Sequence, residues 1–346
     1  MPSVSIGVTD GPEEYQFTRI IDAVVLPDSR IVVANFTSPP EIRLFMPDGT
    51  HVWSVGGIGA GPGEFQGIAW MDYLPSDTIR TFDFWLARAT YFDLEGNVLA
   101  VQPFTEVAGE PMSSFVMSPG LDGGHLIARN NLLIPLDARG RGRAITPLLV
   151  LDRTGVLLDT VAVIPDTEYN VTADGQRSVV AFGPRAGTLP AGQWVYVHTG
   201  DSYTIDVYAP DGVLHRSLRR NEQPRAVRAE DMEAFIADRL QLARNDEERQ
   251  SMERSFRENP HADVMPAYDR PMLADPSGNL WVKQFTAPLD TVAEWAVLSA
   301  EGAFLGLVTV PIPFTLRQIG DSSVMGVWRD ELGVESVRVY ALNKPQ

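Results

Sequence analysis

A unit of alternating apolar and polar residues recurs along the chain, and each complete copy holds a turn between two such runs. The copies span residues 42–55, 89–101, 148–161, 205–218 and 295–308, and a shorter sixth begins at Val337. Alternation with a period of two predicts strands, and a glycine-bearing turn between two strands predicts a hairpin. Upstream of each copy lies another pair of short apolar runs, as at residues 22–36 and 273–285. Six units of four strands predict an all-β fold, a six-bladed β-propeller.

The sixth unit is one strand short. The N-terminal run at residues 3–8 alternates like a strand and has no neighbouring run with which to pair. We therefore expect it to close the ring as the outer strand of the last blade, which would remove an open sheet edge. On this interpretation residues 1–346 form one domain, interrupted by an insertion at residues 220–269.

The insertion has helical periodicity instead of strand alternation. Met232, Phe235, Ile236 and Leu240 predict one helix, and Asn245 with Glu248 three places on predicts the start of a second. The apolar stripe of such a helical hairpin must pack on another surface. Three roles remain open: a static cap on the loops beneath it, a lid over the channel mouth, and a surface for a protein partner or a second copy.

The stretch VGGIGAGPGEFQGIAW, residues 55–70, is rich in glycine, as a phosphate-binding loop would be. A dinucleotide fingerprint needs glycine at positions one, three and six before a helix. Here the sixth position is Pro62 or Glu64, depending on the starting glycine, and a strand follows. We interpret this stretch as a connector between blades.

Several motifs resemble the NHL-type repeats of six-bladed β-propellers: GGIGAGPGEF, IVVANF with EIRLFMPDG, and IRTFDFWLARATYFDLEG. Asn35 and Asp83 stand where those repeats usually carry Asp, and Arg88 where they carry Arg. The later stretches HTGDSYTIDVYAPDG, ADPSGNLWVKQF and GVWRDELGVESVRVYAL are similar to a mostly uncharacterised group of bacterial propellers that are predicted to be exported. The resemblance implies an extracytoplasmic protein, periplasmic or secreted, that binds a ligand or acts as an enzyme.

The connections are tight on one face of the predicted propeller and long on the other, where residues 130–147, 164–178 and the insertion gather. Long loops on a rigid scaffold commonly carry binding sites, so we expect the site at the channel mouth on this face. The ends of the second strands place one residue per blade at the same height. These and nearby positions give the candidate ligand-binding residues Asn35, Asp83, Arg129, Asn130, His198, Tyr268, Asp269, Lys283, Gln284, Trp328 and Arg329. An alternative interpretation is that these side chains tie each loop to its own blade.

Charge and composition exclude some partners. The net charge of −17 argues against nucleic acid and against a polybasic membrane contact. The absence of cysteine excludes disulfides and thiolate metal sites. No apolar run is long enough for a membrane span, and residues 1–10 do not form a signal peptide, as in a chain from which a leader has been removed.

Two functions remain. The first is a binding propeller that captures a small molecule, glycan or peptide under the helical cap without a cofactor. The alternative is a hydrolase or lyase similar to the lactonase propellers, with Ca²⁺ on Asn35, Asp83 and Asn130, or with His198 as a base beside Asp83 or Asp201. The histidines show no metal-ligand spacing, so we assign no metal site. The arginines of residues 138–143 could receive an anionic ligand or lie on a solvated loop.

Overall fold

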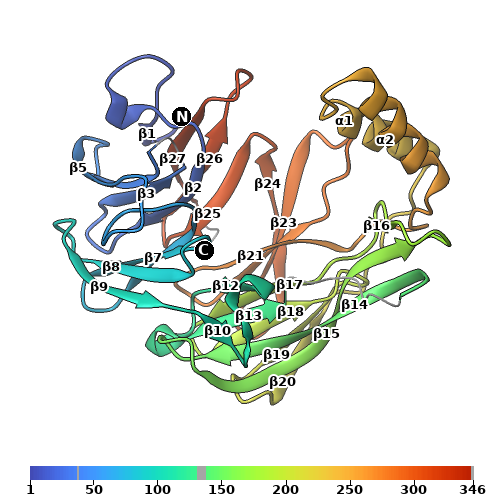
Figure 1. Cartoon of the computed structure of the whole chain (residues 1–346), viewed down its shortest axis with the longest axis horizontal. Coiled ribbons are helices and arrows are strands. Elements are labelled where there is room, and N and C mark those ends of the chain that lie inside the picture. The colour runs from blue at the N-terminus through green and yellow to red at the C-terminus, as the bar shows by residue number, and fades with distance from the viewer. Residues whose placement is uncertain (37–38, 131–137, 344–346) are drawn as a thin grey trace.

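The computed structural model describes residues 1–36, 39–130 and 138–343. Their strands form six sheets of four or five strands and one two-stranded sheet. Figure 1 shows the sheets following one another around the molecule in chain order. First strands of several neighbouring sheets contact one another, as β2 does with β6 and β17 with β21. The fold is a β-propeller with a helical hairpin, as predicted.

The first three sheets occupy the N-terminal half of the chain. The first contains β2 (Ile20–Val25), β3 (Ile31–Asn35), β4 (Glu41–Phe45) and β5 (His51–Gly56). The second contains β6 (Ile68–Leu74), β7 (Thr78–Asp83), β8 (Arg88–Phe92) and β9 (Val98–Pro103). The third contains β12 (Phe115–Ser118), β13 (Leu126–Asn130), β14 (Gly140–Leu151), β15 (Leu157–Val171) and β16 (Arg177–Val179). The small sheet contains β10 (Glu106–Val107) and β11 (Glu110–Pro111).

The other three sheets complete the ring. The fourth contains β17 (Gly187–Ala191), β18 (Trp194–His198), β19 (Thr204–Tyr208) and β20 (Leu214–Arg219). The fifth contains β21 (Tyr268–Ala274), β22 (Leu280–Gln284), β23 (Val292–Leu298) and β24 (Phe304–Pro311). The sixth contains β25 (Phe314–Ile319), β26 (Ser323–Arg329), β27 (Glu335–Ala341) and the N-terminal β1 (Val4–Ile6).

The N-terminal strand joins the last sheet, which confirms the expected closure. β1 pairs antiparallel with β27, with Val4 opposite Val339 and Ile6 opposite Val337. Ile6 is buried in a cluster that also contains Met325 from the sixth sheet and Ile20 from the first. Similar apolar clusters fill the space between each pair of neighbouring sheets. The core is therefore a ring of contacts between sheets, and the cluster around Ile6 closes it.

Two segments expected as long loops contain strands. Residues 131–137 lie outside the described residues, but Gly140 pairs with Val171 and Gly142 with Tyr169 in an arm made by β14 and β15. The inward side chains of the arm, Ala144, Tyr169 and Val171, form a small core of their own. The prediction of loops at residues 140–147 and 164–171 was wrong, because two adjacent strands satisfy each other's backbone hydrogen bonds without a supporting sheet.

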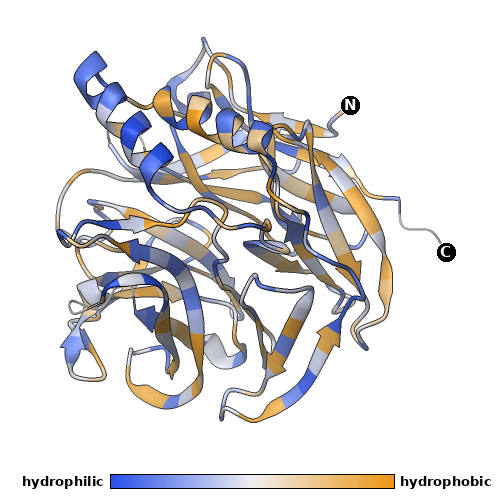
Figure 2. Ribbon diagram, turned by 90° about the vertical axis from the view of Figure 1, so that its right-hand side faces the viewer, coloured by the Kyte–Doolittle hydropathy of each residue, from blue (hydrophilic) through white to orange (hydrophobic). Residues whose placement is uncertain are grey.

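The insertion forms the two predicted helices, α1 (Ala229–Leu240) and α2 (Asp246–Glu258). The Asn245 side chain accepts a hydrogen bond from the Glu248 backbone N–H at 2.8 Å, which is the expected cap. Figure 1 places both helices to one side of the molecule, above β16, and Figure 2 shows α2 as largely hydrophilic and α1 as a mixture of hydrophobic and hydrophilic residues. Neither is long and apolar enough to cross a membrane, and the same holds for every helix in the described ranges.

Candidate functional site

The six residues at the ends of the second strands occupy equivalent positions, as the strand alignment predicts. Each lies opposite the first residue of the preceding inner strand. The pairs are Asn35 with Ile20, Asp83 with Ile68, Asn130 with Phe115, His198 with Gly187, Gln284 with Tyr268 and Trp328 with Phe314. The six side chains nevertheless make very different contacts.

Asp83 holds the glycine-rich connector in place. Its carboxylate accepts backbone hydrogen bonds from Gln66 at 2.6 Å, Gly67 at 2.8 Å and Leu86 at 2.9 Å. Arg88 donates to the carbonyls of Ala60 and Gly61 on the same connector. The residue pair that resembles the NHL repeat therefore binds the loop between β5 and β6, and the carboxylate is already occupied by three N–H donors.

The candidates on the first and sixth sheets have separate surroundings. Asn35 is fully buried. Trp328 lies in the apolar cluster between the fifth and sixth sheets, with the Arg338 guanidinium 4.5 Å from its ring centroid. Arg329 is exposed. The suggested Ca²⁺ ligands Asn35, Asp83 and Asn130 belong to three different sheets. The described residues contain no group of three or more acidic or histidine side chains placed to hold a metal ion.

A second set of candidates lies close together where the fourth and fifth sheets meet. The Lys283 Nζ binds the Asp269 Oδ2 at 2.8 Å. The Gln284 side chain donates to Glu294 at 3.1 Å and accepts from Arg220 at 3.4 Å. The His198 and Tyr268 rings lie 5.4 Å apart. This part of the predicted site is therefore spatially coherent.

His198 and Tyr268 are both enclosed and neutral. Burial lowers the pKa of His198 to about 4, although the main chain and carboxylate of Asp269 oppose the change. Neither ring nitrogen has hydrogen-bond geometry to any protein atom in the described ranges. Burial likewise raises the pKa of Tyr268 to about 12. Asp201, suggested as a partner of His198, instead binds Arg143 at 2.5 Å.

A cavity of about 650 Å³ lies between α1 and the start of β21. Phe182, Phe235 and Phe285 provide its aromatic surface, and Ala234 and Ala237 face it from α1. Tyr268 and Asp269 are the predicted site residues on its wall. The helical hairpin therefore covers the region where the fourth and fifth sheets meet, on the face with the long connections.

The helical hairpin packs on the propeller through aromatic side chains. Phe235 of α1 lies 5.3 Å from Phe182, which in turn lies 6.0 Å from Phe285, the residue after β22, measured between ring centroids. Phe256 of α2 lies 5.5 Å from Phe235. The apolar stripe predicted from the sequence therefore continues into the wall of the cavity.

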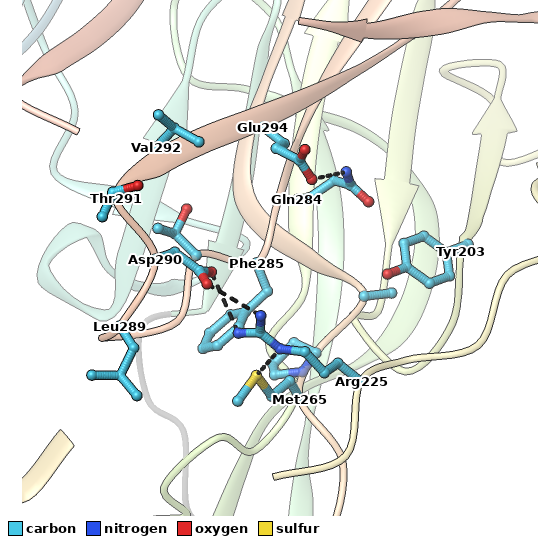
Figure 3. A pocket seen from close by; sticks show the side chains of 13 residues that line it. Tyr203, Arg225, Met265, Gln284, Phe285, Leu289, Asp290, Thr291, Val292 and Glu294 are labelled. Carbon is cyan, nitrogen blue, oxygen red and sulfur yellow. Dashed lines mark hydrogen bonds and ion pairs between the residues drawn. The ribbon is translucent and has the colours of Figure 1, made fainter. Parts of the chain in front are cut away.

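A smaller pocket of about 460 Å³ adjoins this cavity and shares Pro266, Phe285 and Thr286 with it. Figure 3 shows its charged groups already paired. Arg225 reaches Asp290 at 3.1 Å and the sulfur of Met265 at 3.2 Å, and Gln284 binds Glu294. The larger cavity is the better candidate site because fewer of its charged groups are paired.

Sequence reasoning missed three arginines on the wall of the larger cavity: Arg185, Arg239 and Arg270. It pointed instead to the arginines of residues 138–143. In the structure Arg141 binds Glu168 at 2.5 Å, and Arg143 binds Asp201 and the Pro165 and Thr199 carbonyls. Acidic partners therefore already neutralise two of its three arginines, Arg141 and Arg143. Nothing in the spacing of the three missed arginines indicates that they meet.

The ring of sheets defines the class of protein, a β-propeller. No family model matches the chain, and no curated protein matches it. Among solved structures, a member of the DUF4221 family from Bacteroides vulgatus is 12% identical with a TM-score of 0.59, covering 99% of this chain and 97% of that one. A candidate exported protein from Bacteroides fragilis is 11% identical with a TM-score of 0.53, covering 98% and 94%. Virginiamycin B lyase from Staphylococcus aureus is 8% identical with a TM-score of 0.47, covering 98% of each chain. At these identities the likeness concerns the fold alone.

Proposed function

We propose that this chain is an extracytoplasmic binding propeller that captures a small molecule in the cavity beneath α1. The observation that carries the proposal is the cavity itself. Its volume of about 650 Å³ lies within the usual range for small-molecule sites. Its wall combines aromatic rings with charged groups, which is typical of a pocket that both buries and orients a ligand.

The contacts of the predicted residues support binding over reaction. Asp83 and His198 are each 1% exposed, and the Asp83 carboxylate already accepts hydrogen bonds from the backbone of the connector. A substrate in the cavity would meet Asp269 and Arg270 at the start of β21, not these two side chains. The extracytoplasmic location is supported by the resemblance to exported propellers and by the similarly folded candidate exported protein from Bacteroides fragilis.

A cavity-filling variant tests the proposal. Ala237 lies on the cavity wall, so Ala237→Leu should occupy ligand space, and both residues suit a helix. A thermal-shift screen of small fragments should give ligands that stabilise the wild-type protein and lose that effect in Ala237→Leu. Ala229→Leu, an exposed position on the same helix, is the matched control and should retain the response. Stabilising fragments that are indifferent to Ala237→Leu, or no stabilising fragment at all, would contradict the proposal.

A further inference from the structure

The cavity beneath α1 collects positive charge from three separate elements. Arg185 lies on the segment between β16 and β17, Arg239 on α1 and Arg270 on β21, and all three line the cavity. The chain as a whole carries a formal charge of −17. Three guanidinium groups at one cavity of such an acidic protein suggest that this cavity has a specific role.

Acidic side chains of the protein do not pair with all three of these arginines. Arg185 and Arg239 make no ion pair with any side chain in the described ranges. Arg270 reaches Asp166 only at 3.4 Å, and Asp166 is shared with Arg129 at the same distance. On the cavity wall, Asp269 is bound by Lys283, which leaves Asp238 of α1 as the other carboxylate.

The arginines also act on one another. Desolvation lowers the pKa of Arg185, and the charges of Arg270 and Arg239 lower it further against the opposing effect of Asp269 and Asp166. Desolvation and Arg270 likewise lower the pKa of Arg129. The Nε atom of Arg270 is buried without a hydrogen-bond partner among the described residues. A bound anion would relieve the repulsion and supply acceptors for these donors.

Aromatic rings lie beside the arginines. The Arg239 guanidinium is 5.3 Å from the centroid of the Phe235 ring, and Phe182 and Phe285 continue the same surface. Guanidinium groups form paired hydrogen bonds to carboxylates and phosphates, and the rings offer a surface for an apolar body. The two features together fit a molecule with one anionic end and one apolar end.

We propose that the cavity binds an organic anion whose carboxylate or phosphate group lies among Arg185, Arg239 and Arg270 and whose apolar body lies on Phe182, Phe235 and Phe285. This inference rests on the proposed function and adds the chemical class of the ligand. Guanidinium groups bind both carboxylates and phosphates, so the test includes one probe of each kind.

Three simple probes separate charge from shape. Benzoate and phenyl phosphate carry an anionic group on a phenyl ring, and benzamide is the neutral counterpart of benzoate. We expect titration calorimetry to show benzoate or phenyl phosphate binding at least about tenfold more tightly than benzamide, since a charged hydrogen bond contributes that much or more. Arg185→Gln and Arg239→Gln should each weaken the anion about tenfold. Arg254→Gln, an exposed arginine on α2 outside the cavity, is the matched control and should leave the affinity unchanged.

The possible failures are distinct. Equal binding of benzamide and benzoate, both lost in Ala237→Leu, would overturn the inference about charge and leave the proposed capture function intact. Anion binding that survives Arg185→Gln and Arg239→Gln would place the anion elsewhere and also overturn the inference. If the anionic probes do not bind while neutral fragments respond to Ala237→Leu, only the inference about charge fails. If no probe or fragment responds to the cavity variant, both proposals fail.

Discussion

Asp83 and His198 occupy the same register in their sheets, yet their surroundings give them opposite properties. Asp83 is buried with its side-chain oxygens accepting hydrogen bonds from the backbone N–H groups of Gln66, Gly67 and Leu86. His198 is buried without such partners, and the loss of hydration favours its neutral form. Both side chains are better placed to shape the scaffold than to contact a ligand.

The low pKa of His198 predicts that the protein loses stability in mild acid. The pKa is about 4 in the folded chain and about 6.5 when the side chain is free in water. Between these values His198 binds a proton in the unfolded chain but not in the folded chain. The contribution of His198 to stability is therefore fully present above pH 6.5 and is lost as the pH falls toward 4. The full contribution of this group is about 3 kcal/mol.

Urea unfolding of the wild-type protein and His198→Asn at several pH values checks this expectation. The free energy of unfolding should fall less steeply on acidification in the variant than in the wild type. Near pH 5 the two slopes should differ by about 1 kcal/mol per pH unit. His261→Asn removes an exposed imidazole at the end of the insertion and serves as the control. Identical slopes for the wild type and His198→Asn would show that His198 does not titrate between the two states in this range.

The sequence predicts the positions of the site residues better than their roles. Strand alternation is a local property, so the ends of the second strands can be aligned with one another from the sequence alone. Arg185, Arg239 and Arg270 meet only because a helix, a loop and a strand converge, and their spacing along the chain has no periodicity. Such a cluster depends on tertiary contacts and leaves no pattern for sequence analysis to find.

At the scale of elements, α1 packs Met232 and Phe235 on one small apolar cluster that includes Phe182. α2 has no buried residue, and Phe235 of α1 forms the main aromatic link to Phe182. We expect Phe235→Ala to release the helical pair without unfolding the sheets, since a weakly attached element can open independently of the core. Hydrogen exchange at residues 229–258 should accelerate at least about tenfold, while β3 should keep its protection.

Leu242→Ala is the control for this change, because Leu242 lies between the helices and is 66% exposed. It should leave the exchange of both helices unchanged. Faster exchange throughout the sheets of Phe235→Ala would mean that the helical pair is an integral part of the core, and unchanged exchange in the helices would mean that other contacts hold them.

Periodicity in the sequence predicts whether a segment is a strand or a helix wherever one face of the segment packs on a core. The two helices and the repeated hairpins were therefore predictable. The arm of β14 and β15 was not, because Pro147, Pro165 and the arginines of residues 138–143 obscure its alternation. The arm also buries only a small cluster of its own, so its sequence carries a weak hydrophobic signal.

At the scale of the whole molecule, β1 joins the two ends of the chain. Ile6 fills the cluster between the sixth and first sheets, and without β1 the strand β27 would become an open edge. We expect a chain lacking residues 1–8 to be less stable by about 4 kcal/mol, because it loses a buried isoleucine and a strand ladder. For a chain of this length that corresponds to a fall in Tm of about 5 °C.

Adding a peptide in trans distinguishes ring closure from a general effect of truncation. A peptide of residues 1–10 should restore the Tm of the shortened chain by occupying the free edge of β27, as donated strands do in other sheets. The same peptide with Ile6→Asp should not, since it would place a charge in the buried cluster. Val8→Ala in the full chain, at a residue outside β1 that is 39% exposed, should change little, whereas Ile6→Ala should reproduce much of the loss. A shortened chain as stable as the full one, or rescue by both peptides alike, would show that β1 does not close the propeller through Ile6.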